Sequence, residues 1–437
     1  MGNGKIAVFW FRRDLRLDDN AALYHALKSG FKVLPIFIFD TDILNKLESK
    51  ADARVTFIHR ELLTIKKELE EKHNSSLLVL HGKPSEVWKK ISKNYAVAEV
   101  YANHDYEPYA IKRDSDLRTY LEKNDITFKT FKDQCIFEKN EILKDSGSPY
   151  VVFTPYKNKW LTKLSPFYYR AYPTKKYRKN LFKLPKLNFP GLKDLGFEES
   201  ELKFPDKDYK SVLANYGHDR DFPAMDATSH ISVHLRFGTV SIRELVKTAI
   251  EEKSSVWLSE LIWREFYFSI LYHFPYSAKD SFKKEYDQIQ WRNNESEFKA
   301  WCEGKTGYPM VDAGMRQLNQ TGFMHNRVRM VVASFLTKHL LIDWRWGEHY
   351  FAEKLLDYEL SSNVGGWQWA AGCGVDAAPY FRIFNPQEQI KKFDKDLKYI
   401  KKWIPEFEDP FKYPKPIVDH KEARERCLET YKKALKK

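Results

Sequence analysis

Cysteine is scarce in this sequence, and the residues around it exclude two kinds of site. The 437 residues include four cysteines, Cys135, Cys302, Cys373 and Cys427. None belongs to a Cys-x-x-Cys pair, and no cluster of cysteine and histidine has the spacing of a zinc site. We therefore expect free thiols in a reducing compartment and no metal centre.

The chain also lacks a recognisable targeting or membrane-spanning segment at its start. The opening residues, MGNGKIAVFWFRRDLRLDD, contain one six-residue apolar run before the charged residues begin. A signal peptide or a membrane span needs a longer apolar stretch. The Met-Gly start has no serine or threonine at the sixth position, which disfavours N-myristoylation. We expect a cytoplasmic protein with no membrane partner.

Two common nucleotide-binding signatures are missing as well. No Gly-x-Gly-x-x-Gly sequence and no Walker A sequence follows any apolar run of the chain. A standard dinucleotide site and a P-loop are therefore not predicted. No internal repeat stands out either, which gives no support for a solenoid or a propeller.

Aromatic side chains and positive charge are abundant by contrast. Aromatic residues make up 15% of the chain, with 12 tryptophans and 25 tyrosines, and the formal net charge is +13. Buried indoles need partners for their N–H groups, so this number of tryptophans is unusual for packing alone. The charge favours a partner with a phosphate backbone. A solvated, lysine-rich surface would give the same charge.

Residues 1–131 alternate between strand-like and helix-like segments. Apolar residues recur every three or four positions in the helical stretch 53–72. Near-continuous apolar strands joined by helices are typical of a doubly wound parallel sheet, which binds ligands at the carboxyl ends of its strands. We predict an α/β domain over 1–131. Its expected strands lie at 6–11, 32–40, 76–82, 98–103 and 126–131.

The rest of the chain divides into a connector and a helical domain. Residues 132–210 are rich in proline, glycine, lysine and aromatic residues and lack periodicity, so we expect a long connector with short helices. From 211 to 437 the apolar spacing is helical, and we predict an all-α domain. The expected helices lie at 240–252, 255–274, 311–318, 326–341, 348–360 and 422–437.

The first candidate site lies in the stretch SELIWREFYFS. Glu260 and Trp263 are three residues apart and share one face of a helix, with Arg264 one turn beyond Glu260. A carboxylate beside an indole suggests a pocket that both stacks and hydrogen-bonds a ligand. A surface ion pair between Glu260 and Arg264 over a core tryptophan is an alternative interpretation.

A second candidate lies in TGFMHNRVRMVV. Asn326 and Met330 are four residues apart and share a face, with Arg327 and Arg329 on other faces. An amide and a thioether together suit a flat heteroaromatic ligand. The alternative is a helix N-terminus that carries solvated arginines.

The stretch SSNVGGWQWAAGCG raises a third question. Trp367 and Trp369 are two residues apart, so on a helix or a turn their side chains point about 200° apart. We therefore expect the two rings to have different neighbours. The glycines before them permit close approach of the backbone to something bulky. Core packing on both sides is an equally simple interpretation.

Long motifs in both halves of the chain resemble the photolyase/cryptochrome family, and specifically the class I cyclobutane pyrimidine dimer photolyases. The similarity covers nearly the whole chain. Its motifs are WFRRDLRLDDN (10–20), DFPAMDATSHISVHLRFGTVS (221–241), WREFY (263–267), GKTGYPMVDAGMRQL (304–318), GFMHNRVRMVVASFLTKHLLIDWRWGEHYF (322–351) and NVGGWQWAAGCGVDAAPYFRIFNP (363–386).

The resemblance implies a carbon–carbon lyase that repairs pyrimidine dimers in UV-damaged DNA. Light would excite fully reduced FAD, which would pass an electron to a flipped-out dimer and later receive it back. A cryptochrome-type blue-light photoreceptor is the alternative, and repair of (6-4) photoproducts is a weaker one. The resemblance also implies that the chain binds damaged DNA, has no obligate protein partner and is a monomer. It further implies a cytoplasmic location associated with the nucleoid.

The resemblance implies a set of FAD-binding positions. Asn363 matches the residue that faces flavin N5, and an asparagine there favours repair over signalling. The segment from Thr228 to Ser232 matches the phosphate-binding positions. The full set is Tyr216, Thr228, Ser229, His230, Ile231, Ser232, Trp257, Arg264, Arg329, Asp357, Glu359 and Asn363.

The resemblance also implies lesion-binding and electron-transfer residues. Glu260 and Asn326 would hydrogen-bond the dimer, Trp263 and Trp369 would enclose it, and Met330 would line the pocket. The phosphate-binding arginines would be Arg220, Arg327 and Arg382. The chain of tryptophans that photoreduces oxidised FAD would be Trp367, Trp344 and Trp291.

Several positions depart from the family pattern. His230 and Val233 replace an arginine and a proline, and Glu359 replaces an aspartate, which could lower FAD retention. The residues expected for a folate antenna are replaced by Tyr109-Ala110 and Ser277-Ala278. A deazaflavin or FMN antenna is therefore favoured over folate, and an empty antenna site is also possible.

Overall fold

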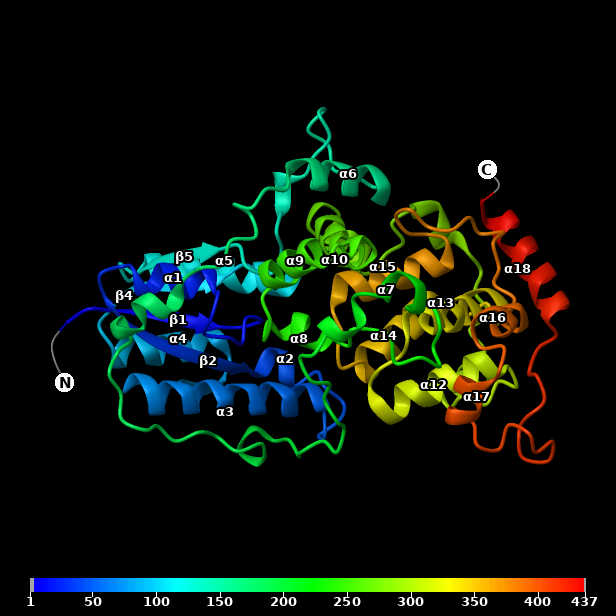
Figure 1. Ribbon diagram of the computed structural model, residues 1–437, viewed down its shortest axis with the longest axis horizontal. Coiled ribbons are helices and arrows are strands. Elements are labelled where there is room, and N and C mark those ends of the chain that lie inside the picture. The colour runs from blue at the N-terminus through cyan, green and yellow to red at the C-terminus, as the bar shows by residue number, and fades with distance from the viewer. Residues whose placement is uncertain (1–3, 436–437) are drawn as a thin grey trace. The chain divides into compact units, whose positions relative to one another are not determined.

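The computed structural model describes residues 4–435, which form two compact units (Figure 1). The N-terminal unit contains the described residues up to 138, 163–207 and 231–251. The helical unit contains 139–162, 208–230 and the described residues from 252 onward. The chain therefore passes between the units several times, and the predicted boundaries at 131 and 210 do not coincide with theirs.

A five-stranded parallel sheet forms the centre of the N-terminal unit, which confirms the predicted α/β fold. Its strands are β1 (Ile6–Phe11), β2 (Lys32–Asp40), β3 (Leu78–Gly82), β4 (Val97–Asn103) and β5 (Thr127–Phe131). The strand order is β3-β2-β1-β4-β5, and all neighbouring strands are parallel. The point where the order reverses lies between β1 and β4, where sheets of this type bind ligands.

Apolar residues on both sides of the strands explain why helices cover the sheet. Every residue of β1 is buried, as expected of a central parallel strand. On one face, Val8, Ile36 and Val100 form a core with Trp88 and Leu117 from two of the helices. The helices of this region are α1 (Ala21–Leu27), α2 (Thr41–Leu44), α3 (Ala53–His73), α4 (Pro84–Asn94) and α5 (Pro108–Glu122).

Two later helices, α8 (Ser232–Phe237) and α9 (Ile242–Glu251), belong to the N-terminal unit, and buried ion pairs hold α9 there. Arg243 of α9 is buried and pairs with Asp19 at 2.8 Å and with Asp133 at 2.7 Å. A buried charge is costly unless it is paired, so these contacts fix α9 beside the start of the chain. The sequence assigned this segment to the helical domain because periodicity does not reveal such distant ion pairs.

The connector contains only short helices, as predicted. It belongs to both units, because residues 139–162 pack in the helical unit and 163–207 in the N-terminal unit. The short helices are η1 (Lys139–Glu141), α6 (Phe153–Lys163), η2 (Thr174–Asn180), η3 (Lys193–Leu195) and η4 (Lys210–Val212).

The described residues of the helical unit contain no strand, in agreement with the predicted all-α domain. One large apolar cluster forms its core. Its remaining elements are α7 (Tyr216–Asp219), α10 (Ser255–His273), η5 (Pro275–Ala278), η6 (Lys284–Gln288), α11 (Glu295–Cys302), α12 (Pro309–Thr321), α13 (Asn326–Ser334), η7 (Phe335–His339), α14 (Trp344–Lys354), α15 (Leu360–Ala371), α16 (Pro386–Phe393), α17 (Lys398–Trp403) and α18 (His420–Leu435).

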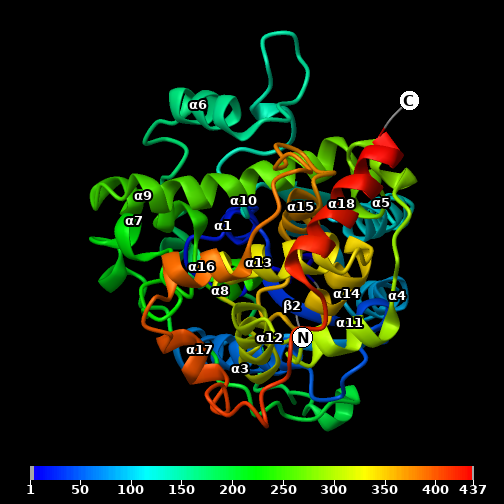
Figure 2. The same ribbon diagram turned by 90° about the vertical axis from the view of Figure 1, so that its right-hand side faces the viewer.

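Helices α10 and α15 lie side by side in both views (Figures 1 and 2). A Cβ atom on Gly365 would lie 2.3 Å from the ring of Tyr267, so only glycine permits this approach. The expectation that a glycine of this pair allows contact with a bulky group is thus confirmed. The bulky group is a side chain of α10, and nothing lies within 4 Å of a Cβ on the next glycine, Gly366.

Two predicted helices are interrupted. The helix expected over 348–360 ends at Lys354, and α15 then begins at Leu360. Glu359 causes the new start because its carboxylate accepts hydrogen bonds from the N–H groups of Ser361 and Ser362 as an N-cap. The helix expected over 326–341 is α-helical to Ser334 and continues as a π-helical turn.

The backbone conformation at Gly238 gives a stability prediction. Gly238 ends α8 with φ of +64°, and a Cβ atom there would lie 2.2 Å from the carbonyl oxygen of Arg13. Gly30 has φ of +92° with nothing within 4 Å of a Cβ. Both Gly→Ala changes strain the backbone, by about 1–3 kcal/mol. We expect Gly238→Ala to lower the free energy of unfolding, measured in urea, by at least about 1 kcal/mol more than Gly30→Ala. Equal losses would contradict the close contact with Arg13.

Candidate active site

One side of α10 carries the first predicted pair. Glu260, Trp263, Arg264 and Tyr267 are half-buried, whereas most of the residues between them are buried in the core. Their spacing of three, four and seven places them along one face of the helix. The predicted shared face of Glu260 and Trp263 is therefore confirmed.

Glu260 does not pair with Arg264 as the alternative interpretation required. Its carboxylate pairs with the guanidinium of Arg220 at 2.5 Å, and Arg220 also lies over the ring of Tyr216 at 5.5 Å. Arg264 lies over the ring of Phe268 at 4.5 Å. Burial, and secondly the charge of Glu260, raises the pKa of Tyr216 to about 12, so its hydroxyl stays protonated. The half-buried face of α10 thus combines a carboxylate, a cation and an indole.

Phe153 covers one face of the Trp263 indole. The two rings are stacked, with centroids 3.7 Å apart and planes 10° apart. Trp160 fixes α6 in this position because its indole N–H donates to buried Glu265 at 2.7 Å. The backbone N–H of Phe153 also donates to Asp376 at 3.2 Å. The rings of Phe266 and Tyr267 also lie near Trp263, each at 5.6 Å, and the indole is half-buried, so part of it stays accessible.

Sequence reasoning missed Phe153 because it lies in the region taken as connector. The apolar residues Phe153, Tyr156 and Trp160 are three, then four, residues apart, which is helical spacing. This signal could have identified α6. It could not have identified the stack on Trp263, which lies 110 residues away.

The two arginines of α13 are paired, which rules out the alternative of solvated arginines. Arg327 pairs with Asp221 at 2.8 Å, and Arg329 pairs with Asp357 at 2.9 Å. The Arg327 guanidinium also approaches the sulfur of Met330 at 4.0 Å. Asn326 is the first residue of α13 and is exposed. The predicted neighbours therefore lie together at the start of one helix.

Trp367 and Trp369 have different neighbours, as predicted. Trp367 is buried, with the ring of Phe351 at 5.0 Å and that of Trp301 at 6.0 Å. Trp369 is half-buried and has the ring of Phe384 at 6.5 Å. One ring of the pair therefore belongs to the core, and the other is partly accessible.

Trp344 and Trp291 belong to the same apolar cluster as Trp367. Hydrogen bonds bring the segments of the first two together: Arg292 N–H donates to the Leu341 carbonyl at 2.7 Å, and Asp343 N–H donates to the side-chain oxygen of Asn293 at 2.9 Å. Trp344 is buried, and Trp291 is only partly buried. The three indoles therefore belong to one apolar region that extends from the buried core to partly exposed positions.

The contact between α14 and α15 links Trp344 to Trp367. A Cβ atom on Gly347, one turn after Trp344, would lie 2.1 Å from the Trp367 ring. Trp301 contacts Trp367 directly as well, and sequence reasoning did not include it. The apolar residues around Trp301 have the spacing of any core-facing helix, so nothing in the sequence distinguished Trp301 from other buried tryptophans.

The predicted flavin-phosphate positions divide between the units. Thr228, Ser229 and His230 belong to the helical unit, and Ile231 and Ser232 belong to the N-terminal unit. In the helical unit, the indole N–H of buried Trp257 donates to the Ser229 hydroxyl at 3.4 Å. His230 has φ of +48°, and its ring nitrogen contacts Asp226 at 2.9 Å and Thr228 at 3.3 Å.

The side-chain amide of Asn363 has its NH2 group engaged and its oxygen available. Its NH2 group donates to the backbone carbonyl of Glu348 at 3.0 Å and to the Glu348 carboxylate at 2.9 Å. Burial raises the pKa of Glu348. The side-chain carbonyl oxygen of Asn363 has no hydrogen-bond partner among the described residues, so it can accept a hydrogen bond from a ligand N–H.

The helical unit has the donors and acceptors that a flavin nucleotide requires. Ser229 and Thr228 offer hydroxyl groups, Arg264 a cation and Asn363 an acceptor for an N–H group. Phosphate, ribityl and isoalloxazine groups need these partners. Glu359 differs from the predicted pattern in one respect. Its carboxylate caps α15, so the charge is already used within the helix.

Arg382 is exposed. Its backbone carbonyl accepts a hydrogen bond from the ammonium group of Lys338 at 2.8 Å. Lys338 is buried, and this burial lowers its pKa to about 8. The segment that carries Arg382 is thus fixed by its backbone while the guanidinium stays accessible.

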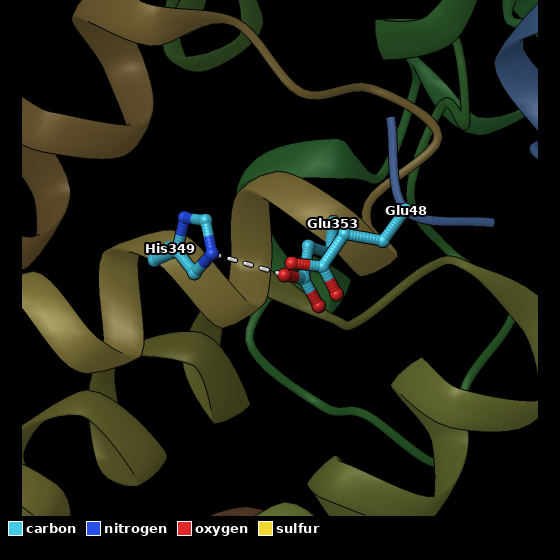
Figure 3. A group of neighbouring side chains, drawn as sticks. All are labelled: Glu48, His349 and Glu353. Atoms are coloured by element: carbon cyan, nitrogen blue, oxygen red, sulfur yellow. Dashed lines mark ion pairs between the residues drawn. The ribbon is translucent and has the colours of Figure 1, made fainter. Parts of the chain in front are cut away.

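A histidine and a glutamate on α14 lie close together, but no ion is needed to explain them. His349 and Glu353 are one helical turn apart and form an ion pair at 3.0 Å (Figure 3). Pairs at this spacing stabilise isolated helices by about 0.2–0.5 kcal/mol. This pair is an ordinary helical contact.

The carboxyl ends of β1 and β2 in the N-terminal unit are lined by aromatic and charged side chains. Asp40 at the end of β2 is buried and accepts a hydrogen bond from the Tyr109 hydroxyl at 2.7 Å. The Arg113 guanidinium lies over the ring of Trp10 at 4.8 Å and over that of Tyr109 at 5.8 Å. Trp10 itself is buried, so half-buried Tyr109 and Arg113 are the groups of this set that a flat ligand can contact.

No helix among the described residues is long and apolar enough to span a membrane.

Comparison with known proteins identifies the family. A family model described as DNA photolyase matches residues 7–176, and one described as the FAD binding domain of DNA photolyase matches residues 257–433. A relative from Synechococcus sp. named deoxyribodipyrimidine photo-lyase is 37% identical, over 94% of this chain and 93% of the relative.

Two solved structures have the same fold over nearly the whole chain. An archaeal photolyase from Sulfolobus tokodaii, described with two FAD molecules, has a TM-score of 0.82 and 35% identity over 98% of this chain and 99% of that one. A cryptochrome from Synechocystis sp. has a TM-score of 0.86 and 25% identity over 98% of this chain and 100% of that one. The motifs, the fold and the relatives agree, and the chain belongs to the DNA photolyase family.

Proposed function

We propose that this protein is a deoxyribodipyrimidine photo-lyase that repairs cyclobutane pyrimidine dimers in DNA with light. The observation that carries the proposal is the half-buried face of α10, where Glu260 and Trp263 lie side by side. A carboxylate accepts the N–H of a pyrimidine, and an indole stacks on its ring. Membership of the family supports DNA as the substrate.

Bound, fully reduced FAD would supply an electron on excitation and receive it back after the ring of the dimer opens. The residues of the chain would bind and orient this group. The free carbonyl oxygen of Asn363 would accept an N–H at N5, and the contact with Glu348 would keep that oxygen directed toward it. The hydroxyl of Ser229 and the guanidinium of Arg264 would interact with the phosphates and the ring edge.

The dimer would bind between the accessible parts of Trp263 and Trp369, both of which are half-buried. Flipping a damaged step out of the duplex costs a few kcal/mol, and stacking contributes about 1–3 kcal/mol per base. Asn326 and Met330, at the start of α13, would complete the pocket. Arg220, Arg327 and Arg382 would contact the backbone phosphates around it.

Arg220 has a second role in this proposal. The Arg220–Glu260 pair has no net charge, so the carboxylate does not repel negative charge that develops on the dimer. A half-buried guanidinium near the lesion would instead stabilise that charge. The dimer would gain one electron, its two cyclobutane carbon–carbon bonds would break, and the electron would be returned, so no net oxidation or reduction would occur.

A blue-light receptor of the cryptochrome type is the second candidate, and the Synechocystis fold gives it a basis. The side chains around the candidate pocket favour repair. Glu260, Trp263, Asn326, Met330 and Trp369 are all suited to bind a pyrimidine pair, and a receptor that only senses light does not require them.

We infer a second, light-harvesting chromophore with flat rings in the N-terminal unit. The carboxyl edge of its sheet carries Tyr109 and Arg113, which are half-buried, and the Arg113 guanidinium lies over buried Trp10. These groups would suit a deazaflavin or FMN better than a folate. The second FAD of the Sulfolobus tokodaii photolyase is a precedent for a flavin in this family. This site could also remain empty without loss of repair.

Glu260→Gln tests the proposed repair. The change removes the charge but keeps the shape, and a hydrogen bond to a charged group is worth about 1.5–3 kcal/mol. We expect the repair yield to fall about tenfold or more, measured by the recovery of thymine absorbance in dimer-containing DNA under blue light. Flavin photoreduction should not change, and Glu252→Gln on the exposed surface is the control. If the unaltered protein restored no absorbance, the proposed function would be wrong.

Phe153 offers a second test. Aromatic stacking contributes about 0.5–1.5 kcal/mol beyond burial, so Phe153→Leu should weaken binding of dimer-containing DNA about two- to tenfold. Phe153→Tyr keeps the ring and should bind normally. Affinity for undamaged DNA should stay the same in both variants. A comparable loss in the Phe153→Tyr variant would show that the stack on Trp263 is not the cause.

The tryptophan chain is tested by Trp367→Phe. Phenylalanine is much harder to oxidise than tryptophan, so photoreduction of oxidised FAD by an external donor should fall to a small fraction of normal, as followed by absorbance during illumination. Repair by chemically reduced protein should persist. Trp403→Phe, at a partly buried position elsewhere in the unit, is the matched control. Normal photoreduction in the Trp367→Phe variant would exclude this route.

A further inference from the structure

Positive charge is concentrated in one stretch of the chain. Residues 146–193 contain 11 lysines and arginines and no aspartate or glutamate. They therefore account for most of the formal net charge of +13. The part of this stretch in the N-terminal unit includes η2, whose sequence TKKYRKN has four cations in seven residues.

Cations from a distant part of the chain lie beside η2. This short helix packs against α1 (Figure 1), and Asn180 donates to the Leu27 carbonyl at 2.9 Å. The ammonium group of Lys32 donates to the Lys179 carbonyl at 3.0 Å. We call the exposed cations gathered here the lysine face: Lys28, Lys32, Lys175, Lys176, Lys179 and Lys183.

The lysine face has almost no counter-charge. Asp18 pairs with Lys175 at 3.2 Å and with Arg178 at 2.5 Å. Within residues 4–435, the other five lysines of the face form no ion pair. Lys28 follows the last turn of α1, where a cation complements the helix dipole, but this explanation does not extend to the lysines of η2 and the segment after it.

Tyrosine rings are interleaved with these cations. Tyr24 of α1 has its ring centroid 5.3 Å from that of Tyr172 and 5.6 Å from that of Tyr177. The ammonium group of Lys28 lies over Tyr24 at 5.1 Å and over Tyr177 at 5.7 Å. All three rings are half-buried, so each has an accessible part. Cations with interleaved aromatic rings are typical of surfaces that follow a nucleic acid backbone.

We propose that the lysine face is a second DNA-binding surface that holds the phosphate backbone without regard to sequence. Lysine ammonium groups act as flexible point charges, which suits phosphate contact rather than base reading. The choice of DNA as the polyanion rests on the proposed function. The surface would raise the affinity for undamaged DNA and the rate at which the protein finds it, because counterion release drives such binding.

A triple substitution tests this surface. Lys28→Gln, Lys176→Gln and Lys179→Gln together remove three charges from exposed side chains that make no ion pair, so the fold should be retained. The control is Lys89→Gln, Lys90→Gln and Lys123→Gln, which removes three exposed, unpaired charges from α4 and the end of α5. Both variants have the same net charge.

The measurement is the affinity for an undamaged oligonucleotide duplex between about 50 and 200 mM KCl. Each lost phosphate contact lowers the slope of log K against log salt by about 0.9, so the lysine-face variant should lose about 2 to 3 units of slope and the control none. An equal loss in the control would mean that net charge alone matters, and an unchanged slope in the lysine-face variant would exclude contact. Either result overturns the proposal.

Two further arms separate this proposal from others. Dimer repair at saturating DNA should be normal in the lysine-face variant, and failure of the unaltered protein to repair dimers would reject the proposed function while leaving the salt-slope result valid. Vesicles of anionic phospholipid are the second probe. Binding to vesicles that exceeds binding to DNA and is lost in the lysine-face variant would assign the surface to a membrane and overturn the choice of DNA.

Discussion

The contact between α14 and α15 at Gly347 is the constraint on which the candidate active site depends. Only glycine leaves room there for the buried ring of Trp367, because a Cβ atom would lie 2.1 Å from it. This ring fixes the rotation of α15 about its axis. The rotation in turn directs Trp369 toward Phe384 and brings Asn363 to Glu348 on α14. A core contact thus positions a stacking residue and a hydrogen-bonding residue at once.

Cations have two separate uses in this protein. Arginines are paired at short distance inside each unit, as in the pairs of Arg243 with Asp19 and Arg220 with Glu260. The six lysines of the lysine face are exposed, and within residues 4–435 only Lys175 among them forms an ion pair. This division follows from chemistry, because guanidinium groups form directed, partly buried pairs and ammonium groups stay hydrated. Exposed lysines therefore contribute positive charge to the surface, whereas the paired arginines hold segments of each unit together.

Close ring contacts connect the chemistry of the helical unit to its stability. Phe153 stacks on Trp263, and Phe351 and Trp301 enclose Trp367. Each contact holds an indole in a single orientation, which lowers the entropy cost of ligand stacking. The abundant aromatic residues therefore serve two purposes: some pack in the core, and others line the accessible candidate pocket.

The sequence by itself determined the fold class, the five strands, long helices such as α3 and α10, and the shared face of Glu260 and Trp263, because hydrophobic period and residue spacing are local properties. The long sequence motifs also indicated the protein family. Tertiary structure alone decided that Glu260 pairs with Arg220, that Phe153 covers Trp263, and that α9 joins the N-terminal unit. These partners lie 40 or more residues apart in the chain, and periodicity carries no information on which distant side chains meet.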